Sequence, residues 1–141
     1  MIKVVVDTNV FVSSFMGGKP KKIVDLWKEG KIKLCLTKKI VDEYIEVLGR
    51  LGLQNEAEIG ELLGVFSEGH NILFSASTPS LSIIKDDPDD NMFIECAVAH
   101  KCPHIISGDR HLLSVKNYMG IKIMSPAEFL GKYFRDSTLQ L

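Results

Sequence analysis

Short apolar runs alternate along the chain with segments in which apolar residues recur every three or four positions. The runs predict buried strands, and the recurring positions predict helices that bury one face. We expect strands at residues 2–6, 31–36, 72–74, 81–84, 104–108 and 121–124. We expect helices at residues 20–29, 37–51, 55–66 and 91–100, and a last helix that begins at Ser125. This alternation predicts βαβ units, and therefore an α/β fold with a parallel sheet covered on both faces.

Length and composition indicate one globular domain spanning residues 1–141. No apolar stretch approaches the roughly 18 residues of a membrane-spanning helix, so we expect no membrane contact. Polar Asp7 and Asn9 interrupt the apolar N-terminal run and no small-residue cleavage site follows, which is unlike a signal peptide. Three cysteines without a Cys-x-x-Cys spacing argue against a disulfide framework and predict a reducing, cytoplasmic location.

Charge is distributed unevenly, although the formal net charge is only −1. Residues 1–39 carry nine lysines and three acids, whereas residues 40–99 carry twelve acids and two bases. Solvated helix faces would explain these runs. A basic surface beside an acidic centre would also explain them, and an enzyme that acts on a polyanion with metal ions needs such an arrangement. The charge pattern alone leaves both explanations open.

Two aspartates directly follow predicted strands. Asp7 ends the run at residues 2–6, and Asp109 follows Ser107 and a glycine at the end of another run. If both strands are parallel, both carboxylates lie at the edge of the sheet where ligands bind in open α/β folds. Each aspartate could instead only cap the turn or helix that follows it. His111, just past Asp109, could approach a substrate or lie at the surface.

The acidic segment KDDPDDN at residues 85–91 offers a third carboxylate. Asp89 or Asp90 could cap the helix that follows. Asp90 lies three, four and seven residues before apolar positions of that helix, so we expect its side chain above the face that packs on the sheet. Asp86, Asp87 and Asp89 lack this alignment and are interpreted as solvated turn residues.

The predicted helix TKKIVDEYIEVLGRL at residues 37–51 offers a fourth carboxylate. Successive residues of a helix are about 100° apart, which places Asp42 and Glu46 opposite the apolar face and Glu43 at its edge. Glu43 is therefore the acid of this helix that could reach the sheet. An isolated glutamate at such an edge could equally extend into solvent.

If Asp7, Glu43, Asp90 and Asp109 converge, their charges repel one another by roughly 4 kcal/mol for each pair about 4 Å apart at an effective dielectric constant of 20. Protons or cations would relieve this repulsion. An all-oxygen site suits Mg²⁺ or Mn²⁺, and such ions activate water and stabilise the leaving oxygen when a phosphodiester bond is cleaved. The four acids therefore predict the metal ligands and catalytic residues of a nuclease, with the lysine-rich first third of the chain available to hold the polyanion.

With these motifs the chain resembles the PIN-domain ribonucleases. The resemblance rests on VVVDTNVFVSS at 4–14, TKKIVDEYIEVL at 37–48, DPDDNMFIECAVAH at 87–100, IISGDRHLL at 105–113 and IKIMSPAEFL at 121–130. Their order and spacing extend over nearly the whole chain, and the combination is specific although no single piece is. Within the family, the chain is most similar to the compact toxin components of toxin–antitoxin systems.

The resemblance implies a three-layer α/β/α sandwich with a central, mainly parallel sheet, and metal-dependent cleavage of single-stranded RNA. Matched residue by residue, the family's acids fall on Asp7, Glu43, Asp90 and Asp109, and its substrate-binding hydroxyl and amide groups fall on Thr8, Asn9 and Ser107. Ser107 stands where many relatives have threonine. The implied cofactor is Mg²⁺ or Mn²⁺. The implied partners are RNA, a cognate antitoxin protein and, as in many members of the family, a second copy of the chain.

Three alternatives remain open. A haloacid-dehalogenase-like phosphatase also has an aspartate after its first strand, but it usually has a second aspartate where this chain has Asn9, and Glu43 would have no role in it. A PIN scaffold with weak catalysis could serve as a module that binds RNA or protein. His100, Cys102 and His104 could bind zinc, although structural zinc sites usually draw ligands from two separated pairs and core packing explains the segment more simply.

Overall fold

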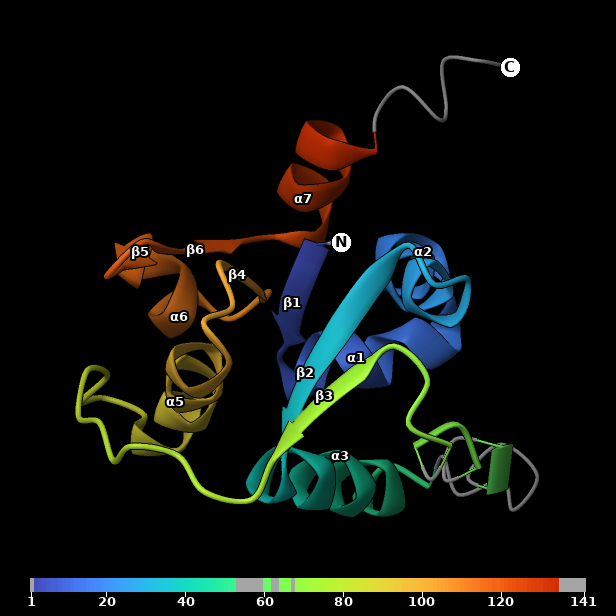
Figure 1. Cartoon of the computed structure of the whole chain (residues 1–141), viewed down its shortest axis with the longest axis horizontal. Coiled ribbons are helices and arrows are strands. Elements are labelled where there is room, and N and C mark those ends of the chain that lie inside the picture. The colour runs from blue at the N-terminus through green and yellow to red at the C-terminus, as the bar shows by residue number, and fades with distance from the viewer. Residues whose placement is uncertain (1, 53–59, 62–63, 67, 135–141) are drawn as a thin grey trace.

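A central sheet organises the computed structural model, which describes residues 2–52, 60–61, 64–66 and 68–134 (Figure 1). Within these residues, six strands follow the order β3-β2-β1-β4-β6-β5. The strands are β1 (Ile2–Val6), β2 (Ile32–Thr37), β3 (Ile72–Ser75), β4 (His104–Ile106), β5 (Asn117–Tyr118) and β6 (Ile121–Met124). Neighbouring strands pair in parallel except for β5, which pairs with β6 in the antiparallel direction at the edge of the sheet.

Helices cover both faces of this sheet. They are α1 (Thr8–Ser13), α2 (Gly18–Lys28), α3 (Lys38–Arg50), α5 (Asn91–His100), α6 (Arg110–Val115) and α7 (Pro126–Tyr133), with the short 3₁₀ turns η1 (Ser14–Met16) and η2 (Pro88–Asp90). Helix α5 packs against the four strands β1 to β4, and α6 packs against β6. Helices α1 and α2 lie on the other side of the sheet (Figure 1). The predicted three-layer α/β/α sandwich is therefore confirmed.

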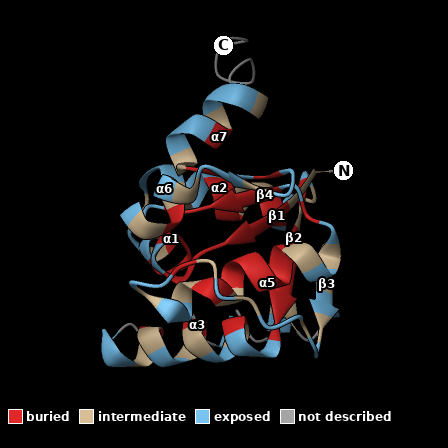
Figure 2. Ribbon diagram, turned by 90° about the vertical axis from the view of Figure 1, so that its left-hand side faces the viewer, coloured by how far each residue is buried: buried red, intermediate tan, exposed pale blue. Residues whose placement is uncertain are grey.

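Strand β1 lies at the centre of the sheet because its side chains are apolar towards both faces. Val4, Val5 and Val6 are at most 2% exposed. Strands that are covered on both faces need such continuous apolar runs. Figure 2 shows the buried residues concentrated in the central strands and in α5, whereas α3 turns one side to solvent. This buried centre gives the residues that follow β1 and β4 a rigid support.

Two predicted helix starts are confirmed by their caps. Thr37 Oγ1 accepts a hydrogen bond from Ile40 N at 3.3 Å at the start of α3. Ser125 and Glu128 bind each other's backbone N–H in the reciprocal pattern of a capping box, which begins α7. Helix α2 begins two residues earlier than the predicted start at Pro20. The predicted helix at 55–66 lies mostly outside the residues that the structure describes.

The predicted strand at residues 81–84 is wrong, because side chains of α5 bind this segment in place of a neighbouring strand. Asn91 Oδ1 accepts hydrogen bonds from Ile83 N at 3.0 Å and Ile84 N at 2.8 Å. Glu95 Oε2 accepts a third from Leu81 N at 2.8 Å. Buried backbone groups must find hydrogen-bond partners, but these partners need not belong to a strand. An apolar segment can therefore show the pattern of a strand without joining the sheet.

Three other features differ from the expectation or extend it. β4 ends at Ile106, so Ser107 lies just beyond the strand, although Ser107 N still donates to Met124 O at 2.9 Å. The short helices α1 and α6, which directly follow Asp7 and Asp109, were not predicted. In the described part of the chain, no helix is long and apolar enough to cross a membrane.

Candidate functional site

Asp7 lies at the carboxyl end of β1 and begins α1. Its backbone N–H donates to Ile106 O at 3.0 Å, which continues the pairing with β4. Its Oδ1 accepts a hydrogen bond from Val10 N at 2.8 Å and so caps α1. The side chain is held by both elements, and only 3% of the residue is exposed. Asp7 therefore has both of the roles that the sequence offered as alternatives. It caps a helix, and it lies at the edge of the sheet.

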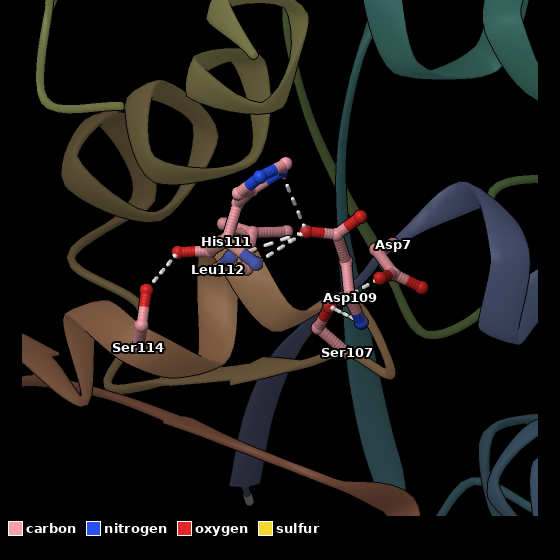
Figure 3. A network of polar contacts seen from close by, with 6 residues as sticks. All are labelled: Asp7, Ser107, Asp109, His111, Leu112 and Ser114. Carbon is pink, nitrogen blue, oxygen red and sulfur yellow. Dashed lines mark hydrogen bonds and ion pairs between the residues drawn. The ribbon is translucent and has the colours of Figure 1, made fainter. Parts of the chain in front are cut away.

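Ser107 connects Asp7 to Asp109 across β1 and β4 (Figure 3). The Ser107 hydroxyl donates to Asp7 Oδ2 and accepts a hydrogen bond from Asp109 N at 2.9 Å. Asp109 Oδ1 caps α6 by accepting hydrogen bonds from His111 N at 2.7 Å and Leu112 N at 3.3 Å. Ser107 is 0% exposed, so from a buried position it binds the carboxylate of Asp7 and the backbone of Asp109.

Glu43 reaches the same region from α3. Its Oε1 accepts a hydrogen bond from Thr8 Oγ1 at 2.5 Å. On the same helix, Asp42 is exposed and pairs with Lys38 at 2.7 Å between Nζ and Oδ2, and Glu46 is also exposed. The helical spacing in the sequence therefore separated Glu43 correctly from its two acidic neighbours.

The acidic segment folds into the tight turn η2 directly before α5. Asp90 N donates to Asp87 O at 3.1 Å across this turn. Asp90 precedes α5, but its side chain does not cap the helix, and its Oδ2 is buried without a hydrogen-bond partner. Asp86 is exposed, as expected. Asp87 is a turn residue as expected, but it is half-buried, and a carboxylate oxygen of it lies within 4.8 Å of one from Asp90 and one from Asp109, which the sequence did not indicate.

The carboxylates open onto one cleft of about 260 Å³ at the carboxyl ends of the central strands. Six acids belong to its lining: Asp7, Glu43, Asp87, Asp89, Asp90 and Asp109. Thr8 and Asn9 also line the cleft, whereas Ser107 lies behind it. Arg50 is the single basic residue in the described lining. The lining of the cleft is therefore strongly negative, and the guanidinium group of Arg50 is its one positive charge among the described residues.

A tighter group within this region joins Asp87, Asp90, Asp109 and His111, since one ligand atom of each lies within 4.8 Å of the others. The structure thus brings two of the four predicted acids, Asp90 and Asp109, into the group and leaves Asp7 and Glu43 in the cleft beside it. Sequence reasoning left His111 open and missed Asp87. The spacing in the sequence could have indicated both residues. Asp87 lies three positions before Asp90 and His111 two positions after Asp109, and a tight turn can bring side chains at such spacings close together.

The comparison with known proteins agrees with this geometry. Residues 3–111 match the PIN domain family. The chain belongs to this family. The match begins in β1 and ends in α6, so it includes all four predicted acids. The uncharacterized protein MJ1680 of Methanocaldococcus jannaschii is similar to this chain, with 34% identity over 146 residues that cover 94% of this chain and 92% of the relative. Family membership removes the phosphatase alternative and indicates nuclease chemistry.

Two carboxyl groups of this PIN domain have raised pKa values. Burial raises the pKa of Asp7 above its ordinary value, although the Ser107 hydroxyl partly offsets this effect. The pKa of Asp90 is raised to about 7, first by burial and then by the negative charges of Asp109 and Asp87. The raised values therefore reflect burial and, at Asp90, repulsion by the neighbouring carboxylates.

The donor atoms of the cleft fit a divalent cation. Carboxylate oxygens are the ligands that Mg²⁺ and Mn²⁺ prefer. The buried Asp90 Oδ2 has no hydrogen-bond partner, which leaves this oxygen available to a cation. Asp7, Glu43, Asp90 and Asp109 all line the cleft, and Asp90 and Asp109 belong to the group whose ligand atoms lie within 4.8 Å of one another. Their roles as ligands and catalytic residues remain predictions.

The histidines of the segment HKCPH have other partners. A ring nitrogen of His100 lies 3.1 Å from Leu36 O. The two ring nitrogens of His104 lie 3.3 Å from Lys3 O and 2.6 Å from the Tyr133 hydroxyl. Among the residues with described positions, this segment contributes to no group of metal ligands. Packing and hydrogen bonding explain the segment, and the zinc alternative has no support.

Proposed function

We propose that this PIN-domain protein is an endoribonuclease that cleaves phosphodiester bonds of single-stranded RNA with the help of Mg²⁺ or Mn²⁺. The observation that carries the proposal is the convergence of Asp7, Glu43, Asp90 and Asp109 on one cleft. Membership of the family supports nuclease chemistry. The excess of acids in the cleft supports the need for a divalent cation, and the resemblance to RNA-cleaving members supports the choice of substrate.

Asp7, Glu43, Asp90 and Asp109 would hold the metal. When bound, a divalent ion supplies positive charge to the scissile phosphate and lowers the pKa of a water molecule. The chain supplies the positions of the ligands. Ser107 fixes the Asp7 carboxylate, and Thr8 fixes that of Glu43. Hydrogen bonds of this kind orient ligands, and their loss typically weakens metal binding 10- to 100-fold.

Four other residues would position the RNA or the carboxylates. Asn9 and Arg50 are exposed and line the cleft, so the Asn9 amide and the Arg50 guanidinium can donate hydrogen bonds to phosphate oxygens. Thr8 and Ser107, which the resemblance assigned to substrate binding, donate their hydroxyl protons to carboxylates. We therefore assign Asn9 and Arg50 to the RNA backbone, and Thr8 and Ser107 to the orientation of the acids.

The biological role we propose is that of a cytoplasmic toxin, held inactive by a cognate antitoxin protein. The support is the similarity of the sequence motifs to those of compact toxins, many of which form homodimers. Expression of the wild-type chain should arrest growth, whereas the Asp109→Asn variant should not. Co-expression of a small protein encoded beside this chain should restore growth. Normal growth when the wild-type chain is expressed would contradict the toxin role. It would not contradict the proposed nuclease activity.

The alternative is a PIN scaffold that binds RNA or protein with little or no cleavage. All four acid positions are filled and face the same cleft. A scaffold without catalysis would have no need to keep this repulsive arrangement, so the geometry favours an active enzyme.

RNA cleavage with Mn²⁺, with Mg²⁺ and with EDTA tests the proposed activity. We expect wild-type cleavage that EDTA abolishes, and a loss of about 100-fold or more in Asp7→Asn and Asp109→Asn, because metal stabilisation of the transition state is worth several kcal/mol. The matched control is Asp42→Asn, which removes an exposed carboxylate on the far side of α3. A wild type that cuts no better than Asp109→Asn would overturn the proposal.

A further inference from the structure

His111 is the single member of the tight acidic group whose side chain is not a carboxylate. Its ring lies beside Asp109, with Nδ1 3.6 Å from Asp109 Oδ1 (Figure 3). This distance is too long for a hydrogen bond. Nδ1 is nevertheless buried and has no hydrogen-bond partner. Packing has thus removed this nitrogen from water without giving it a hydrogen bond, and its contact to Asp109 Oδ1 is a long ion pair that needs a protonated ring.

The fold of the first turn of α6 holds the backbone of His111 beside Asp109. The backbone N–H of His111 donates to Asp109 Oδ1 at 2.7 Å, so the helix cap fixes the two residues relative to each other. In the same group, Asp90 Oδ2 is likewise buried without a hydrogen-bond partner. Two buried atoms without a hydrogen bond, one nitrogen and one oxygen, therefore belong to residues of the same four-membered group. A bound cation would satisfy both.

We propose that His111 Nδ1 is a metal ligand that acts together with Asp87, Asp90 and Asp109, and that it makes the site prefer Mn²⁺ to Mg²⁺. This inference rests on the proposed function, because the ion would belong to the nuclease centre. It goes beyond the four acids, since it adds a nitrogen donor and Asp87 to the ligands.

The preference follows from the chemistry of the donors. Mg²⁺ and Mn²⁺ both favour oxygen ligands, but Mg²⁺ binds oxygen almost exclusively, whereas Mn²⁺, as a transition metal, accepts an imidazole nitrogen more readily. A site of carboxylates alone distinguishes Mg²⁺ from Mn²⁺ weakly. An imidazole in the group adds one metal–nitrogen bond. This bond should strengthen the binding of Mn²⁺ and contribute little to the binding of Mg²⁺. His111 would thus determine which metal the enzyme takes.

Pulsed electron paramagnetic resonance of the Mn²⁺-bound wild-type protein tests the nitrogen directly. We expect a ¹⁴N coupling to Mn²⁺ that changes to the ¹⁵N pattern when histidine is labelled with ¹⁵N. The coupling should disappear in His111→Gln and persist in His70→Gln, the matched control, because His70 is exposed and lies outside the group. The wild-type measurement needs no substitution, so it does not depend on how well a variant folds.

Calorimetric titration with Mn²⁺ and with Mg²⁺ tests the preference. We expect His111→Gln to weaken Mn²⁺ binding by about tenfold or more, because even the loss of an outer partner of a ligand typically costs 10- to 100-fold. Mg²⁺ binding should change much less. Asp87→Asn should weaken the binding of both ions, whereas Asp42→Asn should weaken neither.

The outcomes separate this inference from the proposed function. Mn²⁺ that binds to the wild type without nitrogen coupling, and no longer binds to Asp109→Asn, would overturn the role of His111 and leave the carboxylate site intact. Equal loss of Mg²⁺ and Mn²⁺ affinity in His111→Gln would overturn the preference. Failure of the wild type to bind either ion would overturn both proposals.

Discussion

The Thr8 hydroxyl donates a hydrogen bond to Glu43 Oε1 at 2.5 Å, which joins the first turn of α1 to the middle of α3. Thr8 directly follows Asp7 and is 4% exposed. The same short stretch of chain therefore supplies one acid to the cleft and positions another that is 35 residues away in the sequence. The arrangement of the acids depends on such side-chain contacts as well as on the sheet.

Thr8→Val should misplace Glu43, because valine keeps the shape of the side chain but has no hydroxyl proton to donate. We expect Mn²⁺ affinity and RNA cleavage to fall about tenfold, the lower end of the range for partners of metal ligands. Thr8→Ser keeps the donor and should retain most of both. Calorimetry and a cleavage assay provide the measurements. Wild-type metal affinity in Thr8→Val would show that the hydrogen bond does not orient Glu43.

Asp90 should make the metal-free fold less stable as the pH rises. The pKa of this group is about 7 in the folded protein, against an ordinary value of 3.8. Between pH 4 and pH 7 the native state therefore binds more protons than the unfolded state, so the free energy of unfolding falls across this range and levels off above it. Because Asp90 is partly exposed, solvent screening should limit the loss to about 1–2 kcal/mol.

Urea unfolding at pH 5 and pH 8 in EDTA measures this effect as the difference between wild type and Asp90→Asn. The variant cannot ionise at this position and should lose less stability between the two pH values. Asp86→Asn is the matched control, because Asp86 is an exposed acid of the same segment. Saturating Mn²⁺ at pH 8 should restore the stability of the wild type. Identical pH dependence in wild type and Asp90→Asn would contradict the raised pKa.

Arg50→Gln should weaken RNA binding through the loss of one phosphate contact. The slope of log K against log salt should become shallower by about 0.7, the value for one phosphate on a single strand. Binding is best measured in the Asp109→Asn background, which keeps the RNA uncut. Lys39→Gln is the matched control, because Lys39 is an exposed base of the same helix outside the cleft lining. Equal salt slopes in the Arg50 and Lys39 variants would exclude a contact by Arg50.

Asn91→Ala should destabilise the protein by about 3 kcal/mol. The Asn91 amide group accepts from Ile83 N and Ile84 N and donates to Ile84 O at 2.9 Å and Pro88 O at 3.0 Å. Each buried backbone group left without a partner costs about 1–3 kcal/mol. Asn117→Ala, at an exposed position, should cost far less. Urea unfolding makes the comparison, and a small loss in Asn91→Ala would mean that the segment keeps its shape without this side chain.

The sequence was sufficient for the features that depend on local pattern. Apolar runs predicted the five parallel strands of the sheet, and the helical spacing distinguished Glu43 from Asp42 and Glu46. The position of Asp7 and Asp109 after their strands predicted that they share one edge. Each of these inferences needs only the periodicity of an element or the direction of a strand.

The features that depend on tertiary contacts were not predictable in this way. Residues 81–84 look like a strand, but the side chains of Asn91 and Glu95 bind their backbone. Asp87 enters the acidic group because η2 turns it inward, and His111 because the cap of α6 binds its backbone beside Asp109. Periodicity cannot show which neighbour satisfies a backbone group, or how a turn of three residues directs its side chains.

The pairing of β1 with β4 has a consequence for the chain while it is being synthesised. Asp7 leaves the ribosome before Ser107, which holds its carboxylate and is 100 residues further along the chain. Asp109 and the β6 strand that flanks β4 emerge later still. Contacts between such distant segments form late in folding. Under the proposed function, a growing chain therefore carries no complete RNA-cutting centre until Ser107, Asp109 and β6 have left the ribosome.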